Sequence, residues 1–109
     1  MKGKIVLVPF PFTDLTAAKL RPALVLFEGD RDVVVAFISS RLTEEPSPGS
    51  VIVSDGHQEF RLTGLKVSSV VRLDKVATVL KDLVVGEIGE VGEALKMEIN
   101  RKLLETYSL

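Results

Sequence analysis

Short runs of apolar and β-branched residues recur along the first ninety positions of the chain, separated by segments rich in Gly, Pro, Ser and acidic residues. Such runs are typical of β-strands, because branched side chains pack well on a pleated surface. The run over residues 22–27 is apolar throughout, which predicts a strand buried on both faces. The predicted strands cover residues 4–10, 22–27, 32–39, 50–54 and 68–73, residues 74–80 as a continuation of the fifth strand or as a sixth, and a short extended segment over residues 84–89.

Only the C-terminal part of the chain has the pattern of a helix. Between residues 90 and 107 an apolar residue recurs every four positions, and charged residues occupy the other faces. Five or six short strands followed by one amphipathic helix predict a mainly β fold, in which a small antiparallel barrel carries the helix on one side.

Length and composition narrow the class of protein. A chain of 109 residues is predicted to form a single domain over residues 1–109. It contains no cysteine, which excludes a disulfide framework and a thiolate metal site. His57 is the only histidine and is expected to be a solvated loop residue, so we predict no metal site and no cofactor. No apolar run is long enough to span a membrane and no signal peptide is recognisable, so we expect a cytoplasmic protein.

The charge of the chain is small but unevenly distributed. A net charge of -1 argues against a protein that coats nucleic acid generally, because such proteins are strongly basic. The first 27 residues carry four basic residues against one acidic residue, Asp14. This excess can attract an anionic substrate, and an ordinary scatter of surface charge explains it as well.

Arg21 is the most informative single residue. It precedes Pro22, which favours extended backbone at this point. A guanidinium at the mouth of a strand, after a long loop, can bind a phosphate through two parallel hydrogen bonds. An arginine at a strand end that pairs with Asp14 or another carboxylate accounts for the same residues, and the residues alone do not separate the two interpretations.

Two further groups of polar residues follow predicted strands. Ser39, Ser40 and Arg41 end the third strand, where their hydroxyls and charge can contact a phosphate or simply cap a turn. Arg72 and Asp74 are two residues apart in a predicted strand and so lie on one face. Such a pair can perform acid–base chemistry or form a structural salt bridge.

Several segments resemble a known family. Residues 2–14, KGKIVLVPFPFTD, and residues 19–26, KLRPALVL, closely resemble the N-terminal signature of the MazF/PemK (Kid) family of toxin endoribonucleases. Residues 35–40, VAFISS, resemble the second motif of that family, and residues 68–74, SSVVRLD, resemble the third. The resemblance therefore extends over almost the whole chain.

This resemblance implies a small SH3-like barrel with a C-terminal helix, usually a homodimer. It implies an enzyme that cuts single-stranded RNA, such as mRNA, without a metal ion, and whose cognate antitoxin occupies the same groove. It also implies that Arg21 is the catalytic arginine, that Ser39 stands where members carry Thr or Ser, and that Arg72 and Asp74 have acid and base roles. The candidate substrate-binding residues beside them are Asp14, Lys19, Ser40 and Arg41.

In the implied mechanism a base removes the proton from the 2′-hydroxyl of the RNA, which then attacks the adjacent phosphate. The products are a cyclic phosphate and a 5′-hydroxyl, and DNA, which lacks the 2′-hydroxyl, is expected to be spared. The chain departs from the family at two places. Lys4 replaces the aspartate of the Gly-Asp-Ile start, and residues 15–19 lack the acid that many members carry before the Arg-Pro motif. The second departure leaves the general base open.

Two other functions fit a barrel of this kind. The first is a catalytically inactive module that binds RNA or an antitoxin peptide, which the missing loop acid favours. The second is a gyrase-poisoning toxin resembling CcdB. That family uses a Trp-Gly-Ile tail, whereas residues 106–109 read TYSL and the chain has no tryptophan.

Overall fold

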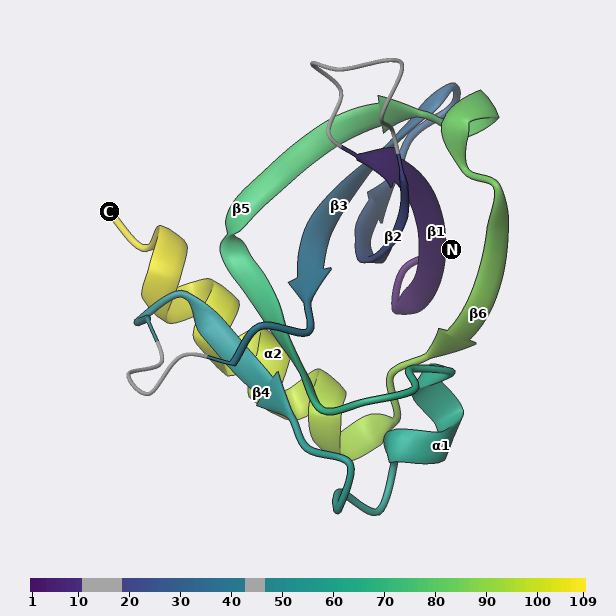
Figure 1. The fold of residues 1–109 in the computed structure, drawn as a ribbon. Helices are drawn as coiled ribbons and strands as arrows, with labels where there is room; N and C mark the ends of the chain where they lie inside the picture. The colour runs from purple at the N-terminus through teal and green to yellow at the C-terminus, as the bar shows by residue number, and fades with distance from the viewer. Residues whose placement is uncertain (11–18, 43–46) are drawn as a thin grey trace.

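The computed structural model describes residues 1–10, 19–42 and 47–109. In this part of the chain, six strands form one antiparallel sheet in the order β4-β5-β3-β2-β1-β6, and the sheet curls into a half-barrel (Figure 1). The strands are β1 (Lys4–Phe10), β2 (Lys19–Glu28), β3 (Asp32–Ser39), β4 (Ser50–Val53), β5 (Ser69–Leu80) and β6 (Gly86–Glu90). The helices are α1 (Phe60–Thr63), the 3-10 turn η1 (Lys81–Leu83) and α2 (Glu93–Tyr107). The predicted mainly β fold with one main C-terminal helix is confirmed.

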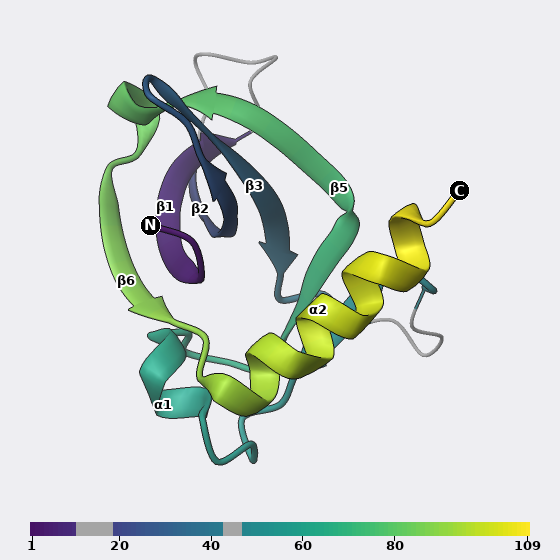
Figure 2. The ribbon, with the colours of Figure 1, turned by 180° about the vertical axis from the view of Figure 1, so that it is seen from behind.

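The curled sheet carries an apolar cluster on each of its two faces, because side chains alternate along each strand. The inner cluster lies within the curl and consists of Val6, Val8, Ala23, Val25, Val33, Val35 and Val79. The outer cluster lies between the sheet and α2, which crosses the outside of the sheet in Figure 2. Its buried members are Ile5, Leu24, Ala36, Ile38, Val51, Val53, Val71, Leu73, Val91, Leu95 and Ile99.

The predicted bounds of β1 and β3 are confirmed, but β2 is longer than predicted. It begins at Lys19 rather than Pro22, because Lys19, Leu20 and Arg21 continue the pairing with β1. Pairing with β3 begins only at Ala23, next to Pro22, which has no N–H to donate to a ladder. Burial on both faces is confirmed only for residues 23–25, since the two ends of the strand are exposed.

Residues 69–80 form one strand rather than two, and that strand is sharply bent (Figure 1). Arg72 pairs with Phe37 of β3, whereas the next residue of β3, Ala36, pairs with Val76. Three residues therefore have no partner in β3, and we call them the β5 bulge: Leu73, Asp74 and Lys75. A bulge bends its strand and redirects the side chains around it.

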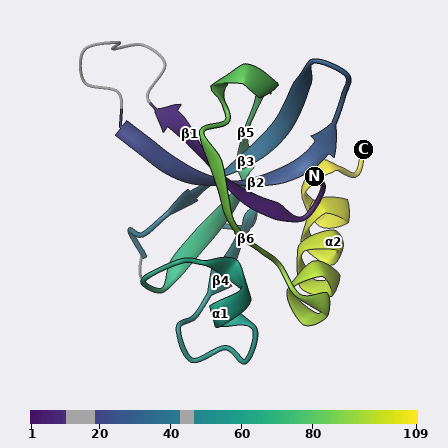
Figure 3. The ribbon, with the colours of Figure 1, turned by 90° about the vertical axis from the view of Figure 1, so that its right-hand side faces the viewer.

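The expectation that only the tail is helical is wrong, because α1 is a single helical turn in a segment for which no strand or helix was predicted. Four residues are too few for a periodic pattern to show. His57 is also not simply solvated: it is half-buried, and its Nδ1 accepts a hydrogen bond from the Glu59 backbone N–H at 3.0 Å. Figure 3 shows α1 beside the end of β6, at the same end of the molecule as the start of α2.

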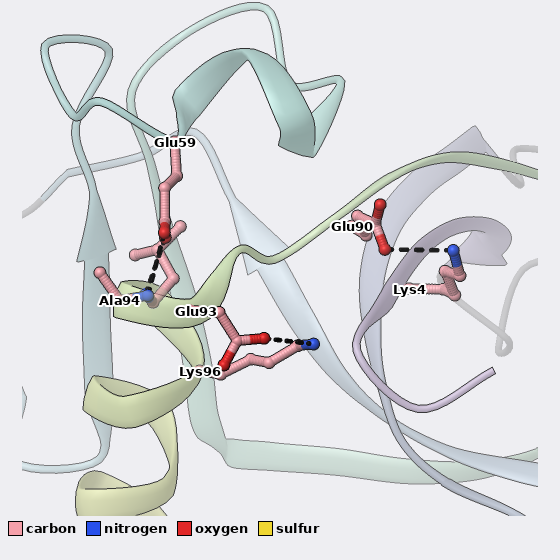
Figure 4. A network of polar contacts seen from close by, with 7 residues as sticks. Lys4, Glu59, Glu90, Glu93, Ala94 and Lys96 are labelled. Carbon is pink, nitrogen blue, oxygen red and sulfur yellow. Dashed lines mark hydrogen bonds and ion pairs between the residues drawn. The ribbon is translucent and has the colours of Figure 1, made fainter.

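The main helix begins at Glu93, three residues later than predicted, because Glu90 still pairs with Lys4 in the sheet. The Glu59 carboxylate accepts hydrogen bonds from the backbone N–H groups of Ala94 and Leu95, each at 2.9 Å (Figure 4). These bonds satisfy donors that the first turn of a helix leaves unpaired, and they lower the pKa of Glu59. No helix in the described part of the chain is long and apolar enough to cross a membrane.

Candidate functional site

The sheet brings three of the predicted site strands side by side, in the order β5-β3-β2. Across these strands, Ala23 pairs with Phe37 and Phe37 pairs with Arg72. Directly opposed residues of an antiparallel pair project from the same face. Since Ala23 and Phe37 belong to or pack on the inner cluster, Arg72 projects from the inner face of the sheet.

Arg21 and Ser39 lie on that same face. Arg21 is two residues before Ala23, and Ser39 is two residues after Phe37, so both share the face of their neighbours in the row. Ser39 is diagonal to Arg72 across β3 and β5. Arg21 lies two residues beyond the Ala23–Phe37 pair, which is the last pair between β2 and β3 at this end, so the same register points Arg21 toward Ser39. Arg21 is exposed and Ser39 half-buried, so this corner of the inner face is open to a ligand.

Arg72 and Asp74 form a two-pronged ion pair. The Arg72 Nε donates to Asp74 Oδ1 at 3.0 Å, and a terminal guanidinium nitrogen donates to Oδ2 at 2.9 Å. The two side chains are 27% and 37% exposed, so water and ligands reach the pair. Its hydrogen bonds lower the pKa of Asp74 and raise that of Arg72. At neutral pH, Asp74 is therefore ionised and Arg72 protonated.

The serine cluster at the end of β3 has the turn geometry that its sequence allows. The Ser39 hydroxyl oxygen accepts a hydrogen bond from the Arg41 backbone N–H at 3.1 Å, which is the local capping interpretation. The Ser39 hydroxyl proton remains available as a donor. Ser40, Arg41 and, at the start of β2, Lys19 are exposed.

Phe10 and Phe37 form an aromatic pair next to these polar groups. Their ring centroids are 4.8 Å apart at an interplanar angle of 46°, a tilted arrangement that is favourable between aromatic rings. Phe10 is the β1 partner of Lys19, so the aromatic pair joins β1 to the face that carries the candidate site.

Sequence reasoning missed two residues that contact the β5 bulge. Gly49 lies against Asp74: a β-carbon on Gly49 would be 2.9 Å from the Asp74 Cβ. Tyr107, at the end of α2, donates a hydrogen bond from its hydroxyl to the Leu73 carbonyl. A loop glycine and an aromatic residue in a helical stripe are common, so only the fold shows what they touch.

Asp14 lies outside the described residues, so its predicted contact with substrate stays a prediction. No ion pair within the described ranges involves Arg21. Among the same residues, no group of three His, Asp or Glu side chains could hold a metal ion. The arrangement offers fixed cations, a hydroxyl and an ionised carboxylate, which together suit an anionic substrate with a proton to remove.

Comparison with protein families decides the identity. Residues 1–107 match the family described as PemK-like, MazF-like toxin of type II toxin-antitoxin system. The chain belongs to this toxin family. No curated protein matches the sequence.

Solved structures of MazF-like toxins share the fold. An endoribonuclease in complex with its cognate antitoxin from Mycobacterial species has a TM-score of 0.73 and 23% identity, with 100% of this chain and 95% of that chain covered. The Mycobacterium tuberculosis toxin MazF-mt6 has a TM-score of 0.73 and 21% identity, with 97% of each chain covered. An endoribonuclease from Mycobacterial species has a TM-score of 0.71 and 21% identity, covering 100% of this chain and 91% of that one. At these identities the likeness shows the MazF-like fold.

Proposed function

We propose that this MazF-like toxin is an endoribonuclease that cleaves single-stranded RNA without a metal ion. One observation carries the proposal: β2, β3 and β5 gather Arg21, Ser39 and the Arg72–Asp74 pair on one open face of the sheet. Membership of the toxin family supports it, as does the fold shared with proteins that are described as endoribonucleases.

The chemistry uses a nucleophile that belongs to the substrate. The Asp74 carboxylate, held ionised by Arg72, accepts the proton of the RNA 2′-hydroxyl, and the resulting oxyanion attacks the adjacent phosphorus. Ser39 holds a phosphate oxygen, and Arg21 and Arg72 stabilise the charge that builds on the phosphoryl oxygens. The leaving 5′-oxygen takes a proton from Arg72, and the proton held by Asp74 then passes to Arg72 through their hydrogen bonds. The products are a cyclic phosphate and a 5′-hydroxyl.

Recognition of RNA follows from the same groups. Lys19, Ser40 and Arg41 are exposed around the site and contact flanking phosphates, whereas Asp14, which can only accept hydrogen bonds, binds a sugar hydroxyl or a base N–H group. DNA has no 2′-hydroxyl, so it binds without being cut. The protein acts on mRNA in the cytoplasm.

Regulation follows from the toxin class. We propose that a cognate antitoxin neutralises the protein by occupying the same open face, and that the toxin is a homodimer. The mycobacterial endoribonuclease in complex with its cognate antitoxin supports an antitoxin partner. Isothermal titration of RNA into a purified toxin–antitoxin complex tests it, because an occupied face leaves no RNA binding.

Incubation with a labelled single-stranded RNA and a DNA of the same sequence, each with and without EDTA, tests the cleavage proposal. We expect RNA cleavage in both buffers, no DNA cleavage, and about a 10²- to 10³-fold loss in Arg21→Ala, the cost of one charge-stabilising donor. Arg31→Ala removes the same charge from the exposed turn at the other end of β2 and should cleave normally. RNA that stays intact with the wild type, or equal rates for the two arginine variants, contradicts the proposal.

The ion pair itself favours one alternative, an inactive module that binds RNA or an antitoxin peptide. Both oxygens of Asp74 already accept hydrogen bonds from Arg72, which makes this carboxylate a weak base. Tight RNA binding by the wild type without any cleavage would establish this second function.

A further inference from the structure

The β5 bulge lacks the support that a strand normally receives from its neighbour. Its three residues have no partner in β3, although the Leu73 side chain between Arg72 and Asp74 is fully buried in the outer cluster. Backbone groups near a core must find partners elsewhere. The direction of Arg72 and Asp74 therefore depends on whatever holds the backbone of Leu73.

Two hydrogen bonds from outside the pairing of β5 with β3 hold the backbone of Leu73. The Leu73 N–H donates to the Gly49 carbonyl at 2.7 Å, and the Leu73 carbonyl accepts the hydrogen bond of the Tyr107 hydroxyl. One contact comes from the segment before β4 and the other from the last turn of α2. Figure 2 shows that end of α2 beside the bend of β5.

The helix that carries Tyr107 is itself well anchored. Glu59 bonds its first turn, and Leu95 and Ile99 are buried in the outer cluster along its middle. Tyr107 thus reaches the bulge from a fixed element, and its hydroxyl is a single removable atom. The hydroxyl bonds backbone rather than a side chain, so it sets where the strand bends and does not itself meet substrate.

We propose that Tyr107 is a positioning residue, whose hydroxyl fixes the β5 bulge so that Arg72 and Asp74 keep their paired geometry on the inner face. The inference rests on the proposed function for its kinetic consequence, but its structural part does not. Without the hydroxyl, the Leu73 carbonyl turns toward water, the bulge relaxes, and the pair departs from its two-pronged alignment.

The experiment compares Tyr107→Phe with Thr106→Val in the full chain. Thr106 is the matched control, since its hydroxyl also bonds a backbone carbonyl, that of Lys102 at 2.7 Å, but within the helix. The first readout is a carbon-13 NMR titration of the Asp74 carboxyl, and the second is RNA cleavage, with kcat and KM separated. In Tyr107→Phe we expect the pKa of Asp74 to rise toward its ordinary value and kcat to fall about tenfold, with KM little changed.

Each outcome decides a separate point. An Asp74 pKa that rises in Tyr107→Phe but not in Thr106→Val supports the proposal. An unchanged Asp74 pKa in Tyr107→Phe, an equal rise in both variants, or a wild-type kcat in Tyr107→Phe overturns it. If the wild type cleaves no RNA, the proposed nuclease function fails, while the NMR comparison still decides whether Tyr107 holds the pair.

Discussion

A single added methyl group at Gly49 tests whether the position of Asp74 matters. Gly49 is buried and precedes β4, and its backbone does not adopt a positive φ. The backbone conformation at this position would accept a side chain, but neighbouring atoms leave too little room for one. In Gly49→Ala the new β-carbon would lie 2.9 Å from the Asp74 Cβ and 3.3 Å from its Cγ.

The size of the required movement follows from these distances. Carbon atoms in contact prefer a separation of about 3.5 to 4.0 Å, so Asp74 or the segment before β4 must move by roughly 0.6 Å or more. Rotation of the Asp74 side chain cannot relieve the contact, because a turn about the Cα–Cβ bond leaves Cβ in place, and it would also break the hydrogen bonds from Arg72. The segment cannot withdraw freely either, because the Gly49 carbonyl accepts the Leu73 N–H at 2.7 Å. We therefore expect the ion pair to shift.

A misplacement of about 1 Å in a catalytic group can cost about 10²-fold in rate, so Gly49→Ala should lower kcat for RNA cleavage by about 10- to 10²-fold. Overpacking of this kind should also cost about 1–3 kcal/mol of stability. The matched control is Gly86→Ala, because a β-carbon on Gly86 would meet nothing within 4 Å. Its stability should stay within about 0.5 kcal/mol of the wild type.

Single-turnover cleavage of a labelled RNA, measured well below the unfolding midpoint of each variant, separates misplacement from unfolding. If folded Gly49→Ala cleaves RNA as fast as Gly86→Ala, the geometry of Asp74 does not limit the reaction, and the reasoning from this contact is wrong.

Three further predictions concern stability. Leu95→Ala removes a fully buried side chain and should cost about 3 kcal/mol in urea unfolding, whereas Met97→Ala, 73% exposed on the same helix, should cost less than about 0.5 kcal/mol; equal shifts of the urea midpoint would contradict the packing of α2. Gly64 has a φ of 72°, and a β-carbon there would lie 2.0 Å from a backbone oxygen of β6. Gly64→Ala should therefore reduce the free energy of unfolding by at least about 1–2 kcal/mol, which a lower melting temperature would show. The hydrogen bond from Lys81 is the main cause that lowers the pKa of Glu28 from 4.5 to about 2. The resulting stability is present above pH 4.5 and lost as the pH falls toward 2, so Glu28→Gln should show a flatter loss of stability in that window, and parallel acid unfolding curves would argue against this pair.

The parts of the fold with a long regular pattern could be predicted from the sequence. The bounds of β1 and β3 were predictable because apolar residues fill both strands and turn residues flank them. The buried positions Leu95 and Ile99 were predictable from their spacing on a helical face. The start of β2 at Lys19 could not be predicted, because it depends on pairing with β1, whose length sets how far β2 extends.

The candidate site was predictable to the level of residue types and strands. Arg72 and Asp74 share a face because of strand alternation, and the structure shows them as a two-pronged ion pair. Their place in a bulge was not predictable, since it requires knowing that Phe37 and Ala36 face residues four apart in β5. The supporting contacts of Gly49 and Tyr107 join segments far apart in sequence, and no local pattern encodes them.

The order in which the elements leave the ribosome bears on when this toxin can act. The hydroxyl of Tyr107 reaches a strand 34 residues earlier in the chain, and α2 follows every strand in the described sequence order. A growing polypeptide that still lacks residues 93–107 has an uncovered outer cluster and an unsupported bend in β5. The corner that carries Arg72 and Asp74 therefore gains the support of Tyr107 only after α2 has been synthesised.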